Sequence, residues 1–95
     1  MFKKKRGINL SYYKQGLIYF TCVCFHSLEK KERNEILRLC EEVGGVHTDA
    51  LFCLLTRPEF TVTGVSMRYH VSEKKLIAYR KAFYELYWRQ VMGKK

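Results

Sequence analysis

The stretch TVTGVSMRYHVSEKKLIAY, residues 61–79, decides the fold that this chain predicts. It indicates two short helices joined by a tight turn, because a capping residue precedes each run of helical spacing. Thr61 is placed to cap the first helix and Ser72 to cap the second. His70 falls at the turn, where a left-handed backbone is usually needed. Glycine is the common residue at such a position, whereas histidine adopts it at a steric cost.

Apolar residues recur at helical spacing on both sides of this turn. Ser66 is a small residue at the point where the two helices must approach closely. Val71 is expected to be buried in the core below the turn. The second helix should run to about residue 92, and Gly93 is a natural stop for it. The residues expected to face inward are Val62, Val65 and Tyr69 in the first helix and Leu76, Tyr79 or Arg80, Phe83, Leu86 and Tyr87 in the second.

Residues 11–25 permit two interpretations. Their aromatic and β-branched content favours a strand. However, Tyr13, Leu17, Phe20 and Cys24 repeat at helical spacing, and Ser11 could cap a helix. No partner strand is evident elsewhere in the chain, so we favour a helix.

Two more helices are expected between this segment and residue 61. Ser27 is a candidate N-cap for the first, with Glu29 in its first turn, and Gly44-Gly45 would end it. Its apolar stripe consists of Ile36, Leu37, Cys40 and Val43. Thr48 or Asp49 could then cap a helix over residues 50–56. That helix is apolar on nearly every side, which suits the centre of a bundle, and Pro58 lies beyond its end.

These elements predict an all-α fold, a small helical bundle of four to five helices. Residues 1–10 form a basic N-terminal arm, and residues 11–95 form a single helical domain with the helix pair at residues 61–92.

Positive charge is segregated along the chain, whose formal net charge is +9. Residues 1–14 hold five bases and no acid, and residues 57–95 hold nine bases and three acids. The middle, residues 15–56, holds four bases and six acids. Segregation of this kind indicates a surface that binds a polyanion.

Several functional classes are disfavoured. No run of about 18 apolar residues is present, so we expect no membrane span. A basic start without a signal-peptide core or cleavage site favours a cytoplasmic protein. There is no catalytic triad, phosphate-cradling glycine loop or convincing carboxylate pair, so we expect a non-enzyme without a cofactor.

The four cysteines lack the spacing of a familiar zinc site. Cys22, Cys24 and His26 would need Cys40, His47 or Cys53 to complete a ligand set. We favour reduced thiols packed as small hydrophobes, and leave open a further role for Cys22, Cys24 and His26.

On Thr61, Val65-Ser66, Val71-Ser72, Leu76 and Tyr79-Arg80, the chain resembles the helix-turn-helix superfamily. It is most similar to the small DNA-binding proteins of the sigma-factor region-4 type that phages and integrative elements encode. The likeness covers about twenty residues closely and residues 46–92 loosely, and His70 departs from the usual glycine. It implies a transcriptional regulator or accessory factor whose partner is double-stranded DNA.

The resemblance also assigns roles to exposed residues. The second helix would read base edges in the major groove, and neighbouring bases would hold phosphates. The base-contacting candidates are Glu73, Lys74, Lys75, Ile77, Ala78 and Lys81. The phosphate-contacting candidates are Arg57, Thr61, Arg68, Ser72 and Arg80, together with Lys3, Lys4, Lys5 and Arg6 of the arm.

Other interpretations stand beside this one. Lysines on a helix face are often only solvated, and the arm could be a solubilising segment. Tyr84, Tyr87 and Trp88 could pack in the core or form a homodimer seam. The main alternative function is a small basic interaction protein, an inhibitor or adaptor on a host polymerase or another nucleoprotein. RNA binding is less favoured because no strand platform with stacking aromatics is evident.

Overall fold

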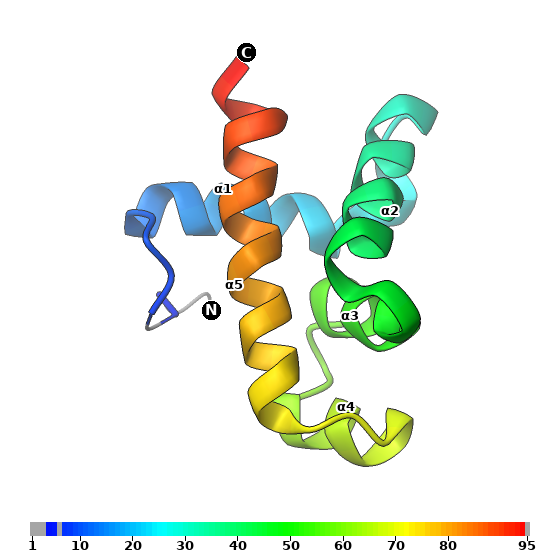
Figure 1. The fold of residues 1–95 in the computed structure, drawn as a ribbon. Helices are drawn as coiled ribbons and strands as arrows, with labels where there is room; N and C mark the ends of the chain where they lie inside the picture. Colours follow the sequence, from blue (N-terminus) through cyan, green and yellow to red (C-terminus); the bar gives the residue numbers. More distant parts are fainter. Residues whose placement is uncertain (1–3, 6, 95) are drawn as a thin grey trace.

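The computed structural model describes residues 4–5 and 7–94, and these residues form five α-helices and no strand (Figure 1). The all-α expectation is therefore confirmed, and the ambiguous segment at residues 11–25 is helical. The helices are α1 (Tyr12–Val23), α2 (Lys30–Gly44), α3 (Thr48–Thr56), α4 (Val62–Tyr69) and α5 (Glu73–Gln90). Short 3₁₀ turns lie at Phe25–Ser27, Gly45–His47 and Met92–Lys94.

The long helix α5 is the axis of the molecule (Figure 1). α1 crosses behind its C-terminal half, and α4 lies beside its N-terminal end. α3 contacts α1, α2, α4 and α5, so the expectation of a central third helix is confirmed. Because α3 is apolar around most of its circumference, only such a position removes its side chains from water.

Two apolar clusters hold these helices together. The larger cluster joins α1, α2, α3 and the C-terminal half of α5 around residues such as Ile18, Ile36 and Phe83. The smaller cluster consists of Ala50, Cys53, Val65, Val71 and Leu76, and fixes α4 and the start of α5 against α3. The ring of Tyr79 packs against both clusters, and its hydroxyl lies 2.9 Å from His47 Nδ1.

Three of the predicted helix caps are confirmed. Ser11 Oγ accepts from the Lys14 N–H at 3.3 Å at the start of α1. Thr61 Oγ1 accepts from the Gly64 N–H at 3.0 Å at the start of α4. Ser72 Oγ accepts from the Lys75 N–H at 3.2 Å at the start of α5. Each hydroxyl satisfies a backbone donor that the first turn of a helix leaves without a partner.

Two other predicted starts are wrong. Ser27 does not cap α2, because it belongs to a 3₁₀ turn that buries Phe25 against Phe52, and the N-cap of α2 is Glu29. Neither Thr48 nor Asp49 caps α3, which begins at Thr48, directly after the preceding 3₁₀ turn. The Thr48 hydroxyl instead donates to the Gly45 carbonyl at 2.5 Å.

The predicted helix stops have mixed outcomes. α2 ends at Gly44, and Gly45 has a φ of 55°, as the glycine pair predicts. Gly93 is not the stop of α5, because the helix already ends at Gln90 and Gly93 lies in the following 3₁₀ turn. A Cβ at Gly93 would lie 2.8 Å from the Trp88 carbonyl oxygen, so glycine is needed there for space.

Gln15, fully buried in α1, fastens the N-terminal arm to the domain. Its Oε1 accepts from the Lys5 N–H at 2.8 Å. Its Nε2 donates to the Leu10 carbonyl at 3.0 Å and lies 3.4–3.5 Å from the carbonyls of Lys5 and Ile8. Ile8 is buried in the larger cluster, so the described part of the arm packs against the bundle.

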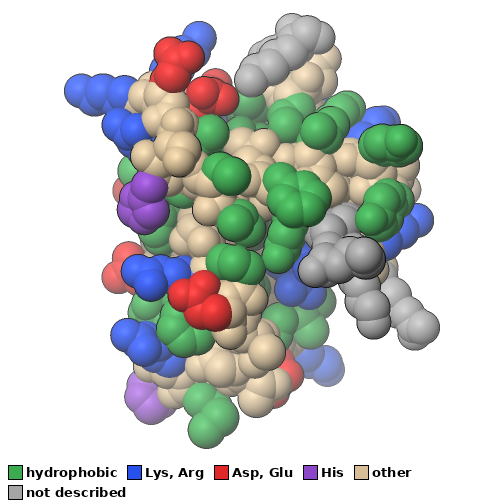
Figure 2. All heavy atoms as spheres, turned by 180° about the vertical axis from the view of Figure 1, so that it is seen from behind, with side chains coloured by type: hydrophobic (Ala, Val, Ile, Leu, Met, Phe, Trp, Pro, Cys, Tyr) green, Lys and Arg blue, Asp and Glu red, His purple; other side chains and the backbone are tan. Residues whose placement is uncertain are grey.

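Aromatic residues of α5 pack in the core. Tyr84 and Tyr87 are buried, and Trp88 is half-buried with Lys14 Nζ 5.0 Å from its ring centroid. The exposed apolar residues lie instead on α1, where Tyr12, Tyr13, Leu17 and Phe20 each expose more than half of their surface. Figure 2, which views the molecule from the α1 side, shows apolar side chains gathered over the upper half of that face.

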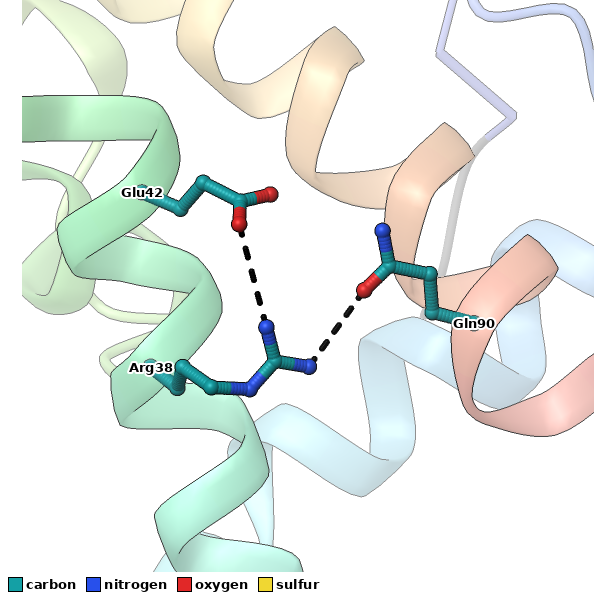
Figure 3. A network of polar contacts seen from close by, with 3 residues as sticks. All are labelled: Arg38, Glu42 and Gln90. Carbon is teal, nitrogen blue, oxygen red and sulfur yellow. Dashed lines mark hydrogen bonds and ion pairs between the residues drawn. The ribbon is translucent and has the colours of Figure 1, made fainter.

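A surface contact joins α2 to the end of α5 (Figure 3). Arg38 forms an ion pair with Glu42 at 3.8 Å and donates to Gln90 Oε1 at 3.3 Å. Both partners of the ion pair are about half exposed, so we expect the contact to contribute little stability.

His70 has the left-handed backbone that the turn predicts, with φ 57° and ψ 43°. We expect His70→Gly to stabilise the fold by about 0.5–1 kcal/mol, since glycine adopts this conformation without steric cost. His70→Val should destabilise it by about 1–2 kcal/mol, because a β-branched side chain fits this region poorly. Urea denaturation measures both. His70→Asn is the control and should be nearly neutral; a destabilised His70→Gly protein would contradict the assignment.

Candidate nucleic-acid interface

The pair α4 and α5 is built around a three-residue turn, residues 70–72. Val71 is buried below the turn, and its N–H donates to the Ser66 carbonyl at 3.3 Å. Val65 and Leu76 are fully buried on the facing sides of the two helices. The apolar spacing of the sequence thus fixes which face of α5 is turned outward.

All six candidate base-contacting residues are exposed on the first half of α5. Lys74, Ile77, Ala78 and Lys81 follow one another at helical spacing, so they form a continuous outer face opposite Leu76 and Phe83. Glu73 and Lys75 flank this face. In Figure 1 this half of α5 extends beyond the crossing with α1, toward α4. Ile77 is 45% exposed, so this face also presents an apolar side chain.

The candidate phosphate-contacting residues near α4 are also at the surface. Arg57 and Arg68 are exposed; Arg57 pairs with Glu59 at 3.9 Å, and the Arg68 guanidinium lies 5.5 Å from the Phe60 ring centroid. Thr61 and Ser72 are exposed residues whose hydroxyls accept the capping hydrogen bonds. Both hydroxyls retain a proton to donate.

The remaining candidates differ from one another. Lys4 is exposed, whereas Lys5 and Arg80 are half-buried. Lys3 and Arg6 lie outside the described residues. Arg80 is one residue before Lys81, which places it about 100° away around the helix. Its side chain therefore points away from the centre of the outer face.

Lys5 and Arg80 line one cavity of about 220 Å³ with Tyr19, Pro58, Thr61 and Tyr84. Burial lowers the pKa of Lys5, and the nearby charge of Arg80 lowers it further. Burial also lowers the pKa of Arg80, while Tyr84 acts in the opposite direction. Sequence reasoning named Lys5, Thr61 and Arg80 separately and missed that they share a cavity.

The cysteines do not gather into a metal site within the described part of the chain, where no group of three potential metal ligands is present. Cys22, Cys40 and Cys53 are buried, and Cys24 is exposed. Burial raises the pKa of the Cys40 thiol to about 12 and also raises that of Cys22. These two thiols are therefore held in the neutral form and pack as apolar residues.

Comparison with protein-family models, curated proteins and solved structures finds no match to this chain. Among the described helices, none is both long and apolar enough to cross a bilayer.

Proposed function

We propose that this protein binds double-stranded DNA through the outer face of α5, as a transcriptional regulator or accessory factor of the kind that phages and mobile elements encode. The observation that carries the proposal is the exposed basic face formed by Lys74, Lys81 and their neighbours on a capped, well-packed helix. α5 begins at a tight turn after α4, which is the arrangement of helix-turn-helix proteins.

The charges of the segment support the proposal. Residues 57–95 hold nine bases against three acids, whereas residues 15–56 are mildly acidic. Six of these bases, Arg57, Arg68, Lys74, Lys75, Arg80 and Lys81, lie beside or within α4 and the first half of α5, and they would attract a polyanion to this part of the molecule. In the major groove, Lys74 and Lys81 can donate to guanine O6 and N7, and Glu73 can accept from cytosine N4. Ile77 and Ala78 offer apolar contact to a thymine methyl.

The surroundings of α5 supply groups for the phosphate backbone. Arg57 precedes α4, Arg68 lies in its last turn, and the hydroxyls of Thr61 and Ser72 lie at the helix starts. Contacts of this type set the register of a protein on DNA without reading sequence. Base contacts from α5 would then supply the discrimination, on the order of 1–3 kcal/mol for each good pair.

One observation favours the second candidate function, an inhibitor or adaptor that binds a nucleoprotein. Tyr13, Leu17 and Phe20 expose an apolar face on α1, on a helix whose described residues include one charged side chain, Lys14. An exposed apolar face is typical of a protein contact. The two functions are compatible, because α1 lies away from the first half of α5 (Figure 1).

A salt titration tests the proposal. Fluorescence anisotropy with a random-sequence duplex should give an affinity that falls along a straight log–log line as salt rises from about 50 to 200 mM. Since lysine and arginine contacts release counterions, a slope of about −4 or steeper is expected. Failure to bind any duplex at about 50 mM salt would reject DNA binding and leave the adaptor. If the duplex is bound, selection of bound sequences from a random pool would identify the preferred site.

A further inference from the structure

The cavity between the N-terminal arm, the start of α4 and α5 combines features that anion sites share. Two cationic side chains, Lys5 and Arg80, line it from elements that are distant in the sequence. No aspartate or glutamate is among the described residues that line it. Lys5 is half-buried; its backbone N–H donates to Gln15 Oε1, and its carbonyl accepts from Gln15 Nε2.

Arg80 provides the clearest sign of a missing partner. Its Nε is buried, and no acceptor for it is present among the described residues. Burying a donor of a charged group without an acceptor costs free energy. Between described residues, the ion pairs of arginine are Arg38 with Glu42 and Arg57 with Glu59, and neither involves Arg80. An anion in the adjoining cavity would offset the half-buried charge of the guanidinium.

Neutral groups around the cavity extend the set of donors. Thr61 Oγ1 accepts from the Gly64 N–H, which leaves its own proton available to an acceptor. Val62 also lines the cavity. Because it is the first residue of α4, its N–H has no acceptor within the helix. The positive end of the helix dipole therefore adds to the two cations. Arginine and lysine side chains form charge-assisted hydrogen bonds with a phosphate oxyanion.

We infer that this cavity binds one phosphate group, held by the Arg80 guanidinium, Lys5 Nζ and the Thr61 hydroxyl at the start of α4. The inference goes beyond the proposed function, because the site needs only a phosphate oxyanion. That oxyanion has two sources, a phosphate of the DNA backbone or a small phosphate-bearing ligand.

Nuclear magnetic resonance of the full chain tests the site with inorganic phosphate as the probe. The Arg80 Nε–H signal should shift saturably with phosphate at constant ionic strength and not with chloride alone. Arg80→Gln should weaken the phosphate response of the Thr61 and Val62 amides on the order of tenfold or more. Lys5→Gln should weaken the response of all three signals several-fold. Arg89→Gln, which removes an exposed arginine of the same helix, should leave it unchanged.

The results distinguish rejection of the site from the two sources of the phosphate. A phosphate response that does not saturate, or that is equal in the Arg80→Gln and Arg89→Gln proteins, overturns the site whatever the duplex experiments give. If a short duplex shifts the same Arg80 signal and phosphate competes with it, the occupant is a backbone phosphate. If phosphate and duplex bind together, or if phosphate binds and no duplex does, the occupant is a small phosphate-bearing ligand. Thermal unfolding of each variant verifies that the fold is retained.

Discussion

Lys74→Glu combined with Lys81→Glu should weaken duplex binding by on the order of 100-fold or more at about 50 mM salt. Both lysines are exposed on the outer face of α5, so the substitutions remove two positive charges that would lie between the phosphate backbones and add two negative charges that repel phosphate. The slope of the log–log salt plot should become shallower by about 2. Fluorescence anisotropy across a salt series measures both quantities.

A matched variant separates the face of α5 from net charge. Lys30→Glu with Lys31→Glu changes the charge of the protein by the same amount, at two exposed positions at the start of α2. It should weaken binding only a few-fold, through the overall field. Equal losses in the two double variants would mean that the polyanion contacts no defined face. Glutamate in the first turn of a helix is compatible with the dipole, so Lys74, Lys30 and Lys31 are safe positions for folding.

Gln15→Leu should destabilise the protein by about 2–4 kcal/mol. Leucine fills a similar volume but leaves the Lys5 N–H and the Leu10 carbonyl without the partners that Gln15 provides at 2.8 and 3.0 Å. The arm would have to leave the bundle to reach water, and Ile8 would lose its buried position. Urea denaturation gives the loss of stability, and limited trypsin digestion should cleave after Lys4 or Lys5 well before the rest of the chain.

Gln90→Leu is the corresponding control. Gln90 also makes a side-chain hydrogen bond, but to the exposed Arg38 at the surface (Figure 3). We expect a loss of about 0.5 kcal/mol or less and no change in digestion of the arm. If Gln15→Leu were as stable and as resistant to trypsin as this control, the arm would not depend on Gln15.

Local signals made much of the fold predictable. A cap such as Ser72 acts on a donor three residues away, so a sequence window contains both partners. The left-handed backbone at His70 and the burial of Val65 and Leu76 follow from the same window. The exposed face of α5 was predictable for this reason, since helical spacing that buries Leu76 necessarily turns Lys74 and Lys81 outward.

The wrong predictions have a tertiary cause. Ser27 has the chemistry of an N-cap, but burial of Phe25 against Phe52 holds the chain in a 3₁₀ turn, and α2 begins later. The shared cavity could not be predicted from the sequence either. Lys5 is placed there by Gln15 and Arg80 by the packing of α5, and neither relation is contained in a local pattern. Periodicity assigns faces to single helices, whereas a site built from three elements requires their arrangement in space.

The division of the apolar interior into two clusters has a consequence for how the protein could evolve. The start of α5 rests on the smaller cluster, around Val65, Val71 and Leu76, while α1, α2 and the end of α5 rest on the larger one. Rigidity at the proposed binding end can therefore be adjusted by changes in the smaller cluster while the larger one keeps the chain folded. Tyr79 contacts both clusters, so a substitution there would affect the packing of both at once.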